Sequence, residues 1–222
     1  IFIFLIICIC ISAFTYFLYN YYVIDRNVII QSKDIIDKVH DAKFEVRLDR
    51  GSVPVSAQGI EFNINYWMYL NDYNYRQHED KIIFRKGEMI FNPLVALQKE
   101  SNNLKIVMNT RYFDENNSND LDSEFESESE EPDFHYEEYI VPNIKLQKWV
   151  NINISLVDTT IDVFIDGKLV KTFVLNGYPV ISKDNIVITP QGGFNGFLSK
   201  FNYTNKALSP LQIKEIYHNG PN

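Results

Sequence analysis

The sequence predicts an all-β, two-sheet antiparallel sandwich that is flanked by a helix at each end. Several short stretches alternate apolar and polar residues with a period of two, as strands with one buried face do. Turn residues separate these stretches at short intervals, and no long helical period interrupts them. The strong helix signals are a charge-free run at the start of the sequence and a capping motif near its end.

The clearest strands lie in residues 149–175. Apolar side chains alternate with polar ones over residues 150–156, and residues 161–165 repeat the pattern. Asp166-Gly167 then supplies a tight turn, because Gly tolerates positive φ and Asp bonds to its own backbone. The chain after this turn returns as a partner strand. A sheet that is buried on one side needs a second layer to cover its apolar face.

Residues 1–24 contain no charged side chain. As an α-helix they would extend about 36 Å at 1.5 Å per residue, compared with roughly 30 Å for a bilayer core. We therefore expect a transmembrane helix, a single-pass membrane localisation and the lipid bilayer as a partner. A cleaved signal peptide is the weaker alternative, because neither a basic region nor a small-residue cleavage site is in view. A buried core helix would need protein on every side.

Residues 25–42 mix charges with spaced isoleucines and predict a stalk or amphipathic linker. The sandwich domain is expected over residues 43–222. Ser209 to Gln212 form a capping box with Pro210 at the first helical position, which predicts a short C-terminal helix that ends at Gly220. The other predicted strands cover residues 43–48, 59–70, 81–86, 94–99, 104–109, 186–189 and 197–203.

The negative charge is concentrated in one segment. The chain holds 29 Asp and Glu against 21 Lys and Arg, and twelve of the acidic residues lie in residues 114–138 without a basic one. This Ser- and Glu-rich run predicts a solvated acidic loop. Its Glu126, Glu128 and Glu130 superficially match the carboxylates of a retaining glycosidase, but a catalytic pair needs rigid, partly apolar surroundings. No basic patch with interleaved aromatic residues stands out, so nucleic acid is not expected as a partner.

Two predicted strands place amide and aromatic side chains on the face that points away from the core. These candidate ligand-binding residues are Asn63, Asn65, Trp67, Tyr69, Asn151 and Asn153. Such groups suit the hydroxyls and the apolar ring face of a sugar. Alternatively, the Asn residues wet an open sheet face and Trp67 packs under a loop. No catalytic or metal-binding set is expected, because the four His are scattered without metal spacing.

The C-terminal stretch resembles the ending of laminin-G-like domains of the concanavalin A-like lectin and glucanase superfamily. The resemblance rests on Phe194-Asn195-Gly196, Ala207-Leu208-Ser209-Pro210 and Ile213 to Tyr217, with further matches at Phe62 to Met68 and at Trp149 to Gly167. It implies a two-sheet antiparallel jelly-roll sandwich that is concanavalin A-like. Many members bind glycans or proteins, some with calcium. Ser199-Lys200 stands where the ending usually carries acidic residues, so no cofactor is expected and calcium is the alternative.

The composition is also similar to that of laminin-G-like proteins of large DNA viruses, some of which build a membrane under the capsid. Together with the predicted anchor, this favours a membrane-anchored, non-enzymatic structural or interaction module. It would be a minor virion protein that links an internal membrane to the capsid and contacts other protein subunits. A lectin-like glycan-binding or adhesion protein is the alternative. A glucanase-like hydrolase comes third, because no paired acids lie on neighbouring strand positions outside the acidic run.

Overall fold

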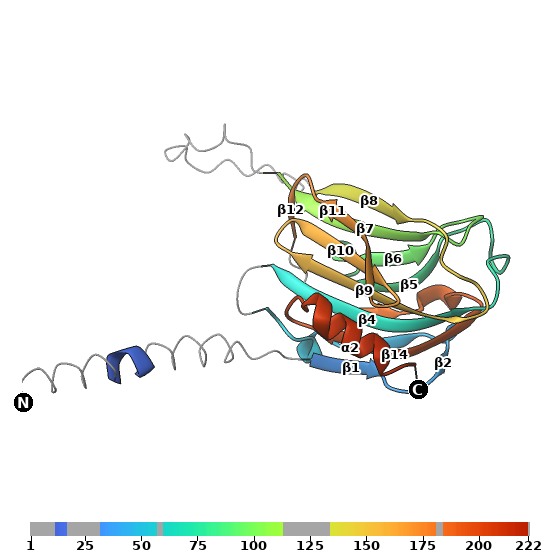
Figure 1. The fold of residues 1–222 in the computed structure, drawn as a ribbon. Helices are drawn as coiled ribbons and strands as arrows, with labels where there is room; N and C mark the ends of the chain where they lie inside the picture. The colour runs from blue at the N-terminus through green and yellow to red at the C-terminus, as the bar shows by residue number, and fades with distance from the viewer. Residues whose placement is uncertain (1–11, 17–31, 57–59, 113–133, 181–183, 222) are drawn as a thin grey trace, which may run out of the picture. The chain divides into compact units, whose positions relative to one another are not determined.

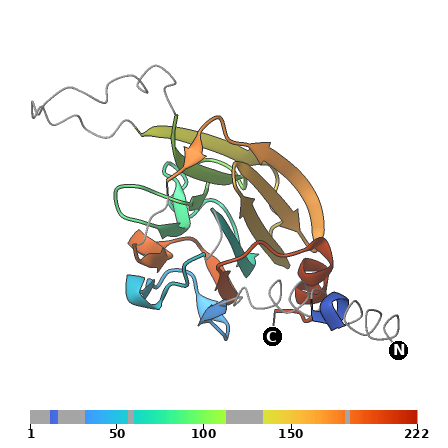
Figure 2. The same ribbon diagram turned by 90° about the vertical axis from the view of Figure 1, so that its left-hand side faces the viewer.

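The structure is a computed structural model that describes residues 12–16, 32–56, 60–112, 134–180 and 184–221. The chain divides into two compact units, residues 1–31 and 32–222. In the first unit, residues 12–16 form a short helix. In the second unit, the described strands form two antiparallel sheets of seven strands each (Figure 1). The predicted all-β, two-sheet antiparallel sandwich is therefore confirmed, and Figure 2 shows it turned by 90°.

The predicted transmembrane helix over residues 1–24 requires a correction. In the ranges that the structure describes, no helix is long and apolar enough to cross a membrane. The helix at residues 12–16 would extend only about 7.5 Å at 1.5 Å per residue, far less than a bilayer core of roughly 30 Å. Residues 1–11 and 17–24 lie outside the described residues. The predicted single-pass membrane localisation is contradicted by this finding.

The first sheet has the strand order β1-β14-β4-β9-β10-β11, and β2 also pairs with β14. Its strands are β1 Ser32–Ile36, β2 His40–Asp41, β4 Glu61–Leu70, β9 Trp149–Val157, β10 Thr160–Ile165, β11 Lys168–Val174 and β14 Gly196–Thr204. β4 and β9 pair without a shift in register from Glu61 opposite Val157 to Tyr69 opposite Trp149. The predicted Asp166-Gly167 turn joins β10 to β11, with both residues at positive φ.

The second sheet has the strand order β12-β7-β6-β5-β13-β3, and β8 also pairs with β7. Its strands are β3 Val46–Leu48, β5 Lys81–Lys86, β6 Leu94–Leu97, β7 Leu104–Arg111, β8 His135–Val141, β12 Tyr178–Pro179 and β13 Ile186–Ile188. Two 3₁₀ turns, η1 Arg50–Ser52 and η3 Pro190–Gly192, lie in the connections. The two-residue β12 has no counterpart among the predicted strands.

Two stretches that were expected outside the strands are paired in the sheets. Within the predicted linker, residues 32–36 pair with β14, and the Ile36 side chain is buried in the core. Within the predicted acidic loop, residues 135–138 belong to β8 and pair with β7. Backbone pairing fixes these residues although their sequences are rich in charge. The rest of the predicted acidic loop up to residue 133 lies outside the described residues.

The inner faces of the two sheets form one apolar core. An aromatic trio stands at its centre: Tyr66 of β4 and Phe201 of β14 stack with ring centroids 5.4 Å apart, and Phe84 of β5 meets both edge-on. All three side chains are fully buried. Burial of each such ring stabilises the fold by about 2–3 kcal/mol. The trio therefore stabilises the contact between the two sheets.

The C-terminal helix α2, Pro210–His218, begins at the predicted capping box. The Ser209 hydroxyl accepts from the Gln212 backbone N–H, and the Gln212 side chain accepts from the Ser209 N–H at 2.9 Å. The helix lies across the face of the first sheet that points away from the second sheet, in front of β4 and β14 in Figure 1. We call this face the outer face. The fully buried Ile213 holds α2 there.

Candidate functional site

The six candidate ligand-binding residues come together on the outer face, where β4 and β9 lie side by side. Register pairs Asn65 with Asn153, Trp67 with Asn151 and Tyr69 with Trp149. The buried members are Asn63, Asn65, Trp67, Asn151 and Asn153, and Tyr69 is partly exposed. The alternative that these Asn residues wet an open face is therefore wrong, because all four side chains are buried. Ligand binding by the six residues stays a prediction.

The buried amides bond to one another across the strands. The Asn63 Nδ2 donates to Asn153 Oδ1 at 2.6 Å and to Ser155 Oγ at 2.7 Å. The Asn151 Nδ2 donates to Asn65 Oδ1 at 2.9 Å. Buried polar groups are tolerated when they are hydrogen-bonded in this way. The Asn-rich face therefore acts as a polar seam between β4 and β9.

Helix α2 packs on the outer face through Trp67. Tyr217 stacks on Trp67 with ring centroids 5.7 Å apart and an interplanar angle of 18°. Beyond the helix, the Ser199 hydroxyl donates to the Pro221 carbonyl oxygen at 2.6 Å. Two buried atoms of the outer-face residues, Trp67 Nε1 and Asn151 Oδ1, form no hydrogen bond within the described part of the chain.

Next to the covered seam, the outer face carries an accessible group of aromatic side chains. Tyr69 lies between Trp149 and Phe197, with ring centroids 5.7 Å and 6.3 Å away. With Val39 and Asn71 these rings line a shallow hollow, which we call the aromatic hollow. The exposed fractions are 38% for Phe197 and 51% for Val39, so a ligand can reach the hollow.

Backbone contacts fix the position of the aromatic hollow. Gly196 begins β14 beside it, and a Cβ at this position would collide with the Tyr69 carbonyl oxygen. This close approach explains why the Phe194-Asn195-Gly196 motif needs glycine. The Asn71 backbone N–H donates to the Asn195 carbonyl oxygen at 3.0 Å, and the Asn71 side chain donates to Asn195 Oδ1 at 3.3 Å. The rim of the hollow therefore presents an oriented amide.

Of the hollow's three rings, only Tyr69 was among the predicted site residues. Trp149 and Phe197 were missed, although both occupy outward positions of their strands. Flat aromatic surfaces with a nearby amide suit the apolar face and the hydroxyls of a sugar, or an apolar side chain of a protein. The arrangement supplies contact surface and hydrogen bonds, which are the requirements of binding.

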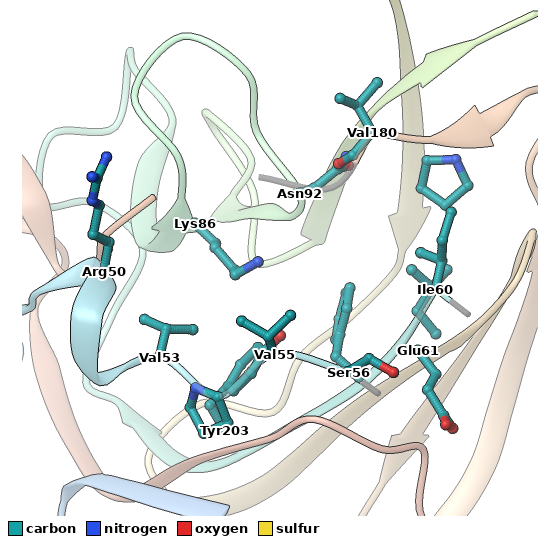
Figure 3. A pocket seen from close by; sticks show the side chains of 14 residues that line it. Arg50, Val53, Val55, Ser56, Ile60, Glu61, Lys86, Asn92, Val180 and Tyr203 are labelled. Atoms are coloured by element: carbon teal, nitrogen blue, oxygen red, sulfur yellow. The ribbon is translucent and has the colours of Figure 1, made fainter. Parts of the chain in front are cut away.

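A separate cavity of about 70 Å³ lies between the sheets, near the start of β4. Its apolar walls include Val53, Phe62 and Leu156, and Figure 3 shows Lys86 reaching into the space near Val53 and Tyr203. Lys86 is only 7% exposed, and its Nζ lies 5.7 Å from the Tyr203 ring centroid. Burial lowers the pKa of Lys86 to about 8, and the Asp184 carboxylate partly opposes that shift.

Glu137 is the buried carboxylate of the described chain. Its oxygens accept hydrogen bonds at 2.6 Å from the hydroxyls of both Thr110 and Tyr139. The backbone N–H groups of Asn176 and Gly177 also donate to it. Burial alone would raise the pKa of Glu137, but these hydrogen bonds outweigh it and hold the pKa below its usual value. The carboxylate thus ties β8 to the chain after β11.

Among the described residues, no group of three or more His, Cys, Asp or Glu could hold a metal ion. Asp166 accepts from the Asn151 backbone N–H at 3.1 Å and from the Lys145 ammonium at 3.3 Å, as a turn residue does. Glu126, Glu128 and Glu130 lie outside the described residues.

No family model and no curated protein matches this chain. Solved structures show the same antiparallel sandwich. The receptor-binding domain of botulinum neurotoxin mosaic serotype C/D aligns with a TM-score of 0.57 at 10% identity, over 86% of this chain and 46% of that one. The receptor-binding domain of botulinum neurotoxin D gives 0.53 at 12%, over 87% and 48%. The serotype G binding domain gives 0.51 at 12%, over 86% and 47%.

The chain therefore spans about half the length of the solved chains that it matches. At this level of identity the likeness describes the fold alone. It supports a β-sandwich of the jelly-roll kind.

Proposed function

We propose that this chain is a non-enzymatic binding module that takes a glycan in the aromatic hollow. The observation that carries the proposal is the convergence of Tyr69, Trp149 and Phe197 from three neighbouring strands at one accessible place. Paired strands hold the three rings, so little conformational entropy is lost when a ligand binds. The apolar face of a sugar ring stacks on such rings, and Asn71 at the rim offers amide hydrogen bonds.

Two further observations favour a binding role. The similar solved structures are receptor-binding domains, and this chain shares their sandwich. The laminin-G-like, concanavalin A-like resemblance of the C-terminal motifs also fits a glycan-binding or adhesion protein, since that fold hosts many binding sites. We propose this laminin-G-like, concanavalin A-like assignment on the motifs alone.

We do not expect a glucanase-like reaction in the aromatic hollow. Retaining and inverting glycosidases need two carboxyl groups that face one sugar bond. The aromatic hollow contains no carboxylate among its lining residues. Glu137, whose oxygens are occupied by donors from Thr110, Tyr139, Asn176 and Gly177, serves structure instead. We expect the protein to leave β-glucans uncleaved.

Glycan-array binding with two matched variants tests the proposal. Phe197→Ala removes a partly exposed ring from the hollow, whereas Tyr136→Ala removes a ring that is 66% exposed on the other sheet. A stacked aromatic contact contributes about 0.5–1.5 kcal/mol, so Phe197→Ala should weaken binding by about two- to tenfold. Tyr136→Ala should bind like the wild type. Silence of the wild type across the array, or equal binding by Phe197→Ala, would contradict the proposal.

A protein partner is the second candidate. The exposed apolar side chains of β11 favour it: Leu169, Val170 and Val174 are 53%, 44% and 65% exposed. β11 is an edge strand, and such edges can add a strand from another chain. Of the predicted virion role, this candidate includes only the contact with other protein subunits. Cross-links from Lys168 or Lys171 to another protein in the native source would favour this candidate over the glycan.

A further inference from the structure

The cavity between the sheets is distinct from the aromatic hollow. Its lining, among the residues that the structure describes, comes from both layers: Phe62, Leu156 and Tyr203 from the first sheet, Lys86 and Pro179 from the second. Most of this lining is aliphatic or aromatic. A cavity with such walls excludes strongly hydrated ligands and favours an apolar chain.

The ammonium group of Lys86 gives the cavity its chemistry. The side chain is nearly buried and reaches into the space shown in Figure 3. An ammonium carries three N–H donors, so it can bond a ligand as well as a protein group. The other charged groups on the lining are Arg50 and Glu61, and the Asp184 carboxylate also acts on the Lys86 ammonium. The Glu61 carboxylate already accepts from the Ala207 backbone N–H at 3.1 Å. A ligand that accepts from the remaining N–H donors of this ammonium, beside apolar walls, is best an anion with an apolar tail.

We propose that this cavity binds a small monocarboxylate with a short apolar chain. The carboxylate bonds to the Lys86 ammonium, and the chain packs against Val53, Phe62 and Leu156. Each water-sized occupant needs about 10–15 Å³. A cavity of about 70 Å³ therefore holds about five to seven non-hydrogen atoms. Pentanoate, with five carbons and two oxygens, has the right size.

The Lys86 pKa of about 8 is consistent with this assignment. The group is mostly protonated at neutral pH, so it can pair with a carboxylate. If the Lys86 amine were neutral, the cavity would bind a carboxylic acid no more tightly than an alcohol of the same size. A cationic ligand of the same shape would meet a like charge at short range. The site therefore discriminates by charge at one end and by chain length at the other.

Ligand-observed saturation-transfer NMR on the full chain tests the proposal with pentanoate as the probe. A ligand of about seven atoms binds weakly, so it is used at millimolar concentration. We expect a signal for pentanoate, a weaker one for acetate and none for pentylammonium. Lys86→Met keeps the length of the side chain but removes its charge, and should lose at least tenfold in pentanoate affinity. Lys99→Met, at an exposed lysine, should bind like the wild type.

A second measurement on the wild-type chain covers the case in which Lys86→Met does not fold. Reductive methylation of lysines is followed by mass spectrometry with and without pentanoate. Pentanoate should slow labelling of Lys86 severalfold and leave Lys99 unchanged, while acetate at equal ionic strength should slow labelling of Lys86 less. No pentanoate signal in the wild type, equal binding by Lys86→Met, or unchanged Lys86 labelling overturns the proposal.

Discussion

At Glu137 a carboxylate is kept inside the fold by the donors that surround it. We predict that Glu137→Gln lowers the free energy of unfolding by about 2–4 kcal/mol, because the amide turns its own N–H donors towards those of Thr110 and Asn176. Glu138→Gln is the matched control. The Glu138 carboxylate is exposed and lies 3.4 Å from the Lys105 ammonium, and such a pair contributes about 0–1 kcal/mol. Urea denaturation measures both, and equal losses would contradict the role given to Glu137.

The same residue predicts a pH dependence. Because the folded pKa of Glu137 is lowered, its ionised form adds stability above the pKa of the unfolded chain, about 4.3. That contribution is lost as pH falls through the lower folded pKa. The difference in stability between wild type and Glu137→Gln should therefore be largest near pH 7 and shrink below about pH 4. Urea denaturation at pH 7 and pH 3 measures it, and a constant difference would argue against this linkage.

The helix α2 is held to the outer face by few apolar contacts. Burial of Ile213 supplies about 1.5–3 kcal/mol, and the stacking of Tyr217 on Trp67 about 0.5–1.5 kcal/mol. Against this, each of the two unbonded atoms, Trp67 Nε1 and Asn151 Oδ1, costs about 1–3 kcal/mol. Leu211 of the same helix is 67% exposed and adds little. We therefore expect the balance between a docked and an undocked α2 to respond to small changes in the helix.

We predict that Ser209→Ala shifts this balance towards the undocked state. Loss of the capping box costs about 1 kcal/mol, so Trp67 should become more accessible to a fluorescence quencher. A Trp149→Phe background isolates the Trp67 signal, and Lys214→Ala, at an exposed position of α2, serves as the control. Hydrogen exchange should likewise be faster in α2 than in β4. Exchange as slow in α2 as in β4 would show that the helix is firmly docked.

The sequence predicted best the strands in which buried apolar side chains alternate with outward-facing polar ones. Period-two alternation located β4 and β9, because their inward positions are all apolar. The alternation failed for β1, where Ile36 is the only buried side chain and pairing with β14 decides the structure. It also failed for the start of β8, because Glu137 is a buried acid inside an acidic run. Local sequence cannot show which donors will surround such a group.

The candidate site could be predicted only in part, because it depends on how distant segments meet. The polar outward positions of β4 and β9 indicated the right face. Nothing in those strands shows that α2 returns to stack on Trp67, or that Asn63 and Asn151 are buried. The aromatic hollow lies where Tyr69, Trp149 and Phe197 meet, and these residues are separated by long stretches of sequence. Strand order brings them together, and strand order is a property of the whole fold.

At the scale of the whole molecule, the aromatic trio should make the two sheets unfold together. Phe84→Ala removes the one ring that the second sheet contributes, and a cavity of this kind typically costs about 3–5 kcal/mol. Phe44→Ala, at a side chain that is 65% exposed, should cost far less. Both tryptophans belong to the first sheet, whereas far-UV circular dichroism reports on both sheets. If the sheets are coupled, the two signals should follow one transition in the wild type and in Phe84→Ala. Transitions that separate would mean that the sheets are stable independently of each other.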